Sequence, residues 1–132
     1  MKMIAAFIQP ARLEFVSRAL VAANILDITI TTCCGHGRDP VLVPSFRGGP
    51  DAPDLLPTLL LEVIVPASKK DEAVQAIVRG ARSGLCGDGK VFITALERVV
   101  RISSGVEIGE ATAIERATKI RRVRSPVHHT TL

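Results

Sequence analysis

The sequence predicts an α+β domain of the ferredoxin-like type, a four-stranded antiparallel sheet with two helices on one face. Its 132 residues form one domain by size, large enough to bury a core. Apolar residues make up 47% and charged residues 23%, as in ordinary globular chains. A strand-helix-strand pattern occurs twice. Neither unit alone can bury its helix, so both are best accommodated in one double β-α-β sheet.

The first unit begins with an apolar run at residues 3–8 (MIAAFI), which Pro10 ends and which predicts a strand. A helix is expected next, because apolar residues recur at helical spacing and a helix start tolerates Pro10. These residues are Leu13, Val16, Leu20 and Ala23. Residues 28–31 (ITIT) alternate with period two and predict the second strand.

The second unit repeats this order. Residues 59–65 (LLLEVIV), ended by Pro66, predict a strand, residues 69–82 a helix, and residues 91–93 (VFI) the last strand. The run at 59–65 is apolar at nearly every position, so it needs cover on both faces. Two helices cover one face, and a second copy of the chain is the simplest cover for the other. We therefore expect an oligomer.

Two segments stand apart from this pattern. Residues 35–57 hold five of the eight prolines and four glycines, and so long a loop in a compact domain is usually functional or mobile. Residues 115–132 carry five basic residues and one acidic residue. Their net charge of +4 equals that of the whole chain. We expect a domain at 1–112 and a basic extension at 113–132. The neutral body and the absence of Trp and Tyr argue against nucleic-acid binding.

Cysteine usage and the N-terminus predict a cytoplasmic protein. The three cysteines include the adjacent pair Cys33 and Cys34, which suits neither a disulfide framework nor a CxxC redox pair. Neighbouring strand residues point to opposite faces, so this pair is not expected to share a metal, and His128 and His129 alone are weak evidence for one. The apolar start is too short for a signal peptide, and no run is long enough to span a membrane.

The stretch GLCGDGKVFI at residues 84–93 is similar to the Walker phosphate-loop motif, G-x-x-x-x-G-K-[ST]. A Walker loop lies between a strand and a helix and carries Ser or Thr after its lysine. Here a helix precedes the glycines, and Val91 follows Lys90. Two alternatives remain: a helix cap and tight turn, or an anion site made by the amides around Gly87 and Gly89 together with Lys90.

Several motifs together resemble the PII signal-transduction family over roughly residues 1–110. The most specific is GxxGDGKVFI followed by ERVVRI, on a duplicated β-α-β chain with a long central loop. IQPARLEFVSRAL resembles that family's first strand and helix. GHGR at 35–38, Arg47-Gly48 and LLP at 55–57 resemble parts of its T-loop, which would span about residues 36–56.

The resemblance implies a non-catalytic regulator that forms a homotrimer and binds adenine nucleotides (AMP, ADP or ATP) in the clefts between subunits. It implies phosphate contacts from the loop Gly87, Asp88, Gly89 and Lys90, from Gly35, Gly37 and Arg38, and from Arg101 of a neighbour, with Ser103 beside them. It places the base against Phe7, Ile64 and Cys86, near Glu62 and a neighbour's Thr29.

Departures from the family bear on the other ligands. Asp39 and Thr58 stand where the family has a glutamine and a lysine for 2-oxoglutarate, so this acid is not expected to be the effector. Asp51 replaces the tyrosine that is uridylylated in the family, which excludes that modification. Ser103 replaces a second arginine of the nucleotide site, so ADP or AMP should compete well with ATP.

These departures resemble a divergent PII-like branch that includes carboxysome-associated and inorganic-carbon-linked members. The resemblance implies bicarbonate as co-ligand, held by Gly37, Arg38, Asp39 and Lys90, and a transporter or carbon-fixation component as target. Three alternatives remain open: a PII-type nitrogen regulator with another co-ligand, a slow nucleotide hydrolase using Asp88, Lys90 and Glu62, and a metal-binding trimer of the copper-tolerance type.

Overall fold

The fold of one chain confirms the ferredoxin-like prediction. A computed structural model describes residues 1–35, 55–85 and 87–109. The strands are β1 (Lys2–Ile8), β2 (Ile28–Gly35), β3 (Leu56–Val65) and β4 (Gly89–Ala95), and the helices are α1 (Leu13–Ala22) and α2 (Lys70–Ala81). Short 3-10 turns, η1 (Pro10–Arg12) and η2 (Ala67–Lys69), lead into the two helices.

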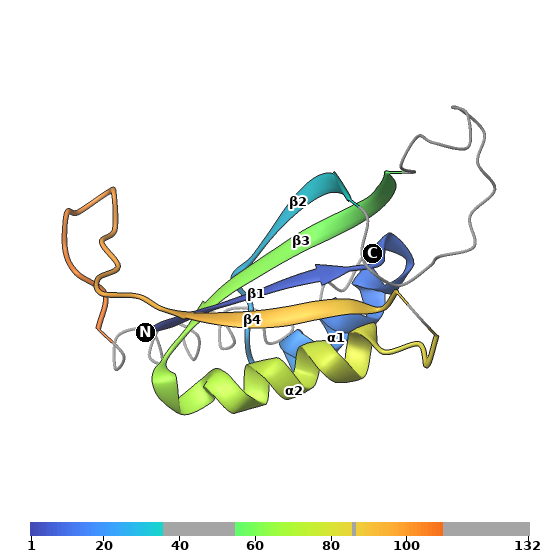
Figure 1. Cartoon of the computed structure of the whole chain (residues 1–132). Coiled ribbons are helices and arrows are strands. Elements are labelled where there is room, and N and C mark those ends of the chain that lie inside the picture. The colour runs from blue at the N-terminus through green and yellow to red at the C-terminus, as the bar shows by residue number, and fades with distance from the viewer. Residues whose placement is uncertain (36–54, 86, 110–132) are drawn as a thin grey trace, which may run out of the picture.

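The sheet has the strand order β2-β3-β1-β4, and every neighbouring pair is antiparallel. Both helices lie on the same face of this sheet (Figure 1). β1 ends and β4 begins at one end of the sheet, because Ile8 pairs with both Leu59 and Gly89. β2 ends there as well, because Gly35 pairs with Leu56 at the start of β3. This shared end therefore carries the loop before β4 and both flanks of residues 36–54.

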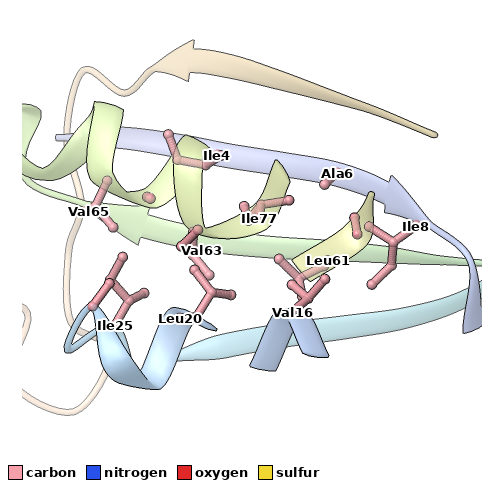
Figure 2. Close-up of a cluster of buried hydrophobic side chains, with 14 of the residues drawn as sticks. Ile4, Ala6, Ile8, Val16, Leu20, Ile25, Leu61, Val63, Val65 and Ile77 are labelled. Carbon is pink, nitrogen blue, oxygen red and sulfur yellow. The ribbon is translucent and has the colours of Figure 1, made fainter. Parts of the chain in front are cut away.

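The core lies between the sheet and the two helices. Alternate residues of the central strands face the helices and are fully buried, as in Ile4 of β1 and Leu61 of β3. They pack against Val16 and Leu20 of α1 and Ile77 of α2 (Figure 2). Where the helices cross, a Cβ on Gly80 would lie 2.5 Å from the Val16 Cα, so the close contact requires glycine.

All four strands are longer than the sequence patterns predict, β1 by one residue only. β2 continues to Gly35 because Thr32 to Gly35 remain paired with Leu59 to Leu56 of β3. β4 also extends in both directions, from Gly89 to Ala95. Cys33 and Cys34 thus lie within β2, beyond the predicted strand at 28–31, and the Cys33 Sγ lies 3.6 Å from the Thr58 carbonyl oxygen.

Other predictions fall on residues outside this description. They are residues 36–54 of the predicted T-loop (36–56), with Gly37, Arg38, Asp39 and Asp51, as well as Cys86 and the extension 113–132 with its two histidines. Within the described ranges, no three His, Cys, Asp or Glu residues gather where they could hold a metal ion. No helix in those ranges is long and apolar enough to cross a membrane.

The face of the sheet that the helices do not cover, here called the open face, is partly apolar. Ile64 of β3 is 44% exposed and Phe92 of β4 is 42% exposed on it. The rings of Phe7 and Phe92 lie side by side, with centroids 5.8 Å apart. The helices cover only one face of the sheet, and the apolar side chains of the open face are half-exposed. This is the situation for which a further covering layer is expected.

Candidate functional site

The glycine loop, residues 83–90, connects α2 to β4 at the shared end of the sheet. α2 ends at Ala81, where Arg82 turns to an extended conformation and its N–H donates to the Val78 carbonyl at 3.0 Å. Gly84, Gly87 and Gly89 have φ values of 84°, 86° and 103°. Backbone of this kind favours glycine, so the repeated glycines follow from the path of the loop.

The end of the glycine loop is pressed against β1. Gly89 pairs with Ile8, and a Cβ at position 89 would lie 1.8 Å from the Phe7 carbonyl oxygen. The next residue, Lys90, pairs with Phe7 and is exposed. Paired strand residues share a face, so the lysine stands on the open face beside the Phe7 ring.

Asp88 closes the glycine loop on itself. Its carboxylate accepts hydrogen bonds from the Ser83 N–H at 2.9 Å, the Gly84 N–H at 3.3 Å and the Ser83 hydroxyl. The Ser83 oxygen in turn accepts from the Leu85 N–H at 3.2 Å. The Ser83 hydroxyl, and then its N–H, hold the pKa of Asp88 below its ordinary value of 3.8. The carboxylate is thus used inside the loop.

This arrangement predicts a loss of loop order in acid. Because the folded-state pKa of Asp88 is lowered, its stabilising effect is present above the unfolded-state pKa and disappears as pH falls through the folded-state pKa. We expect amide protection at Ser83 and Gly84 to be retained above about pH 5 and to fall as the pH drops below the ordinary pKa of 3.8. In Asp88→Asn, amide protection should be lower than in the wild type near neutral pH and should not change as the pH falls.

Amide hydrogen exchange, expressed as protection factors, measures this effect. Asp27→Asn is a suitable control, since Asp27 is exposed and lies before β2. An Asp88→Asn protein whose protection still fell in acid as in the wild type would show that another group controls the loop.

The open face brings together several residues that the sequence predicts for nucleotide binding. Phe7 pairs with Lys90, and Ile64 with Met3, on adjacent strands. Thr29 of β2 pairs with Glu62 of β3, and two strands separate it from Lys90. Adjacent strands are about 4.8 Å apart, so Thr29 and Lys90 lie too far apart within one chain to flank a single phosphate chain.

Arg101 and Ser103 lie at the other end of the sheet from the glycine loop. β4 ends where Ala95 pairs with Lys2, and a tight hairpin follows (Figure 1). In it, the Arg101 N–H donates to the Val106 carbonyl at 3.0 Å, and Val100 bridges to Glu107. One chain therefore does not bring these two residues to Lys90.

Comparison with known proteins identifies the family. The sequence model for the family described as Nitrogen regulatory protein P-II matches residues 1–106. The chain belongs to the P-II family. Its resemblance to this family, inferred from the glycine loop and the duplicated β-α-β pattern, is confirmed.

Three curated P-II proteins illustrate the similarity. The Nitrogen regulatory protein P-II of Azospirillum brasilense is 40% identical over 111 residues, 84% of this chain and 99% of the relative. P-II 2 of Methanothermobacter thermautotrophicus is 42% identical over 105 residues, 80% of this chain and 91% of the relative. P-II 1 of Escherichia coli K12 is 38% identical over 107 residues, covering 81% and 96%.

Two further side chains of this P-II chain contact the glycine loop or the end of α2 that leads into it, and the sequence did not indicate them. Gln9 and Arg12 flank Pro10 in the turn between β1 and α1, and they hydrogen bond to backbone carbonyls that are 68 to 78 positions further along. No periodicity or motif signals a contact at that separation. Only the folded chain reveals it.

Proposed function

We propose that this P-II chain is a non-catalytic regulator that binds adenine nucleotides at the glycine loop and signals to a target protein through residues 36–56. The observation that carries the proposal is the loop itself. Three glycines give it an open backbone, Asp88 closes it, and Lys90 places a cation beside an aromatic ring. Amides and a cation in this arrangement suit the phosphates of a nucleotide.

The same loop argues for binding rather than hydrolysis. A hydrolase needs a group that can take a proton from water. The Asp88 carboxylate already accepts three hydrogen bonds from Ser83 and Gly84. Glu62 lies opposite Thr29 and not beside Lys90. A sensing role therefore fits this chain best.

The complete nucleotide site is proposed to form between subunits of a homotrimer. Thr29 is two strands away from Lys90, and Arg101 lies at the far end of the sheet. Neighbouring copies would supply both residues to the cleft beside Lys90. The half-exposed Ile64 and Phe92 would be covered in the same assembly.

The co-ligand is proposed to be a small anion, bicarbonate, rather than 2-oxoglutarate. Thr58, which stands where the family has a lysine, donates its hydroxyl hydrogen to the Ile8 carbonyl at 3.0 Å and offers no cation. Bicarbonate would meet Arg38 and Lys90, with amides near Gly37 and Asp39. The target would then be a transporter or a carbon-fixation component, as in the divergent PII-like branch.

A second candidate is a nitrogen regulator with another co-ligand. The three relatives described above are named as nitrogen regulatory proteins, and each matches 80% or more of this chain. This candidate keeps the nucleotide site and differs only in the effector and the target.

Calorimetry with AMP, ADP and ATP, alone and with bicarbonate or 2-oxoglutarate, tests the proposal. We expect saturable binding of ADP or AMP. The affinity for ATP should be less than about tenfold higher, because Ser103 supplies no charge to the distal phosphates. Bicarbonate, and neither chloride nor nitrate, should tighten ADP binding. Micromolar binding of 2-oxoglutarate with ATP and magnesium would favour the nitrogen regulator, and the absence of any nucleotide binding would refute both.

A further inference from the structure

The turn between β1 and α1 is joined to the glycine loop and to the end of α2 by two side chains. The Gln9 Nε2 donates to the Gly87 carbonyl at 3.0 Å. The Arg12 Nε donates to the Gly80 carbonyl at 3.0 Å, and its Nη2 donates to the Arg82 carbonyl at 3.3 Å. Both ends of the glycine loop are thus tied to the same short segment of chain.

Arg12 is well placed for this contact. Its guanidinium lies over the Phe15 ring, 4.1 Å from the ring centroid, which gives the side chain a further contact. The carbonyls that it binds are at the C-terminal end of α2, where the helix dipole favours a cation. A planar guanidinium can serve two carbonyls at once, which an ammonium group does less well.

Each contact orients an N–H group as well as a carbonyl, because the peptide group is planar. The Arg82 carbonyl and the Ser83 N–H belong to one peptide group, and that N–H donates to Asp88. The Gly87 carbonyl and the Asp88 N–H likewise belong to one group, and the peptide bonds of the described chain are trans. A carbonyl held by Gln9 therefore directs the Asp88 N–H to the opposite side.

We propose that Gln9 and Arg12 are positioning residues of the glycine loop. They orient the Gly87–Asp88 and Arg82–Ser83 peptide groups before a ligand binds, and so set the affinity for nucleotide phosphates. This inference rests on the proposed function for its ligand. Neither side chain is required to touch the nucleotide.

The expected effect follows from the population of the ordered loop. Apparent affinity falls in proportion to the fraction of molecules in the binding conformation. In a loop that is only marginally ordered without ligand, loss of one anchoring hydrogen bond reduces that fraction about five- to tenfold, and loss of the two made by Arg12 reduces it at least as much. The fold should persist, because Gln9 and Arg12 lie outside the buried core.

The test uses the variants Gln9→Met and Arg12→Met in the full chain. Gln75→Met and Arg79→Met are matched controls, since they make the same chemical changes at exposed positions of α2. Two quantities are measured: the ADP dissociation constant by calorimetry, and backbone amide order parameters over residues 83–90 without nucleotide. Both test variants should bind ADP about five to ten times more weakly and show lower order parameters, while both controls should match the wild type.

Two results would overturn the inference: ADP affinity within about twofold of wild type in both test variants, or unchanged order parameters in the loop. If Arg12→Met does not fold, Gln9→Met alone decides. If the wild type binds no ADP, the proposed function fails. The order parameters still decide in that case, since a drop supports loop positioning and no change refutes it.

Discussion

Gly89→Ala is expected to abolish ADP binding and to lower the free energy of unfolding by about 3 to 5 kcal/mol, the sum of a backbone strain term and an overpacking term. Gly89 has a φ of 103°, and an added Cβ would lie 1.8 Å from the Phe7 carbonyl oxygen. That oxygen belongs to the backbone of β1, an inner strand of the sheet, and cannot move aside as a side chain does. β4 would have to separate from β1 at the point where the glycine loop ends.

Chemical denaturation measures the stability change, and calorimetry measures ADP binding. Gly105→Ala provides a matched control, because Gly105 also has a positive φ, 67°, but has nothing within 4 Å of an added Cβ. The control should be destabilised only by backbone strain, by about 1 kcal/mol. If Gly89→Ala were no less stable than Gly105→Ala, the close approach of the loop to β1 would be wrong.

Lys90→Met is expected to weaken ADP binding by about tenfold to a hundredfold, the cost of losing a hydrogen bond to a charged group. Lys90 is exposed on the open face, and none of the described hydrogen bonds or ion pairs involves its ammonium group. Its removal should therefore leave the thermal unfolding midpoint of the nucleotide-free protein nearly unchanged. Lost affinity without lost stability would mark a binding residue.

Arg79→Met removes the same unit of charge from an exposed position on α2 and serves as the control. Lys90→Arg keeps the charge and should recover part of the affinity. Equal ADP affinity in Lys90→Met and Arg79→Met would mean that the phosphates lie elsewhere.

Much of the fold could be predicted because its signals are local. The apolar runs at 3–8 and 59–65 and the helical spacing in α1 and α2 mark four elements directly. The full length of β2 could not be predicted, since Thr32 to Gly35 show no strand pattern. They are strand because they pair with Leu56 to Leu59, which is a long-range effect.

The candidate site divides in the same way. The glycines at 84, 87 and 89 signal an unusual backbone in the sequence itself, and Lys90 follows them. Gln9 and Arg12 carry no such signal, because their partners are backbone carbonyls far along the chain. The place of Arg101 at the opposite end of the sheet likewise depends on the direction of β4 and not on any motif.

Amide chemical shifts recorded during an ADP titration of the full chain would show whether a nucleotide binds on the glycine loop. We expect saturable shifts at Gly87, Asp88, Gly89 and Lys90, which should require about tenfold to a hundredfold more ADP in Lys90→Met and the wild-type concentration in Arg79→Met. Saturable binding of ADP that left these four amides unshifted would contradict binding at this loop.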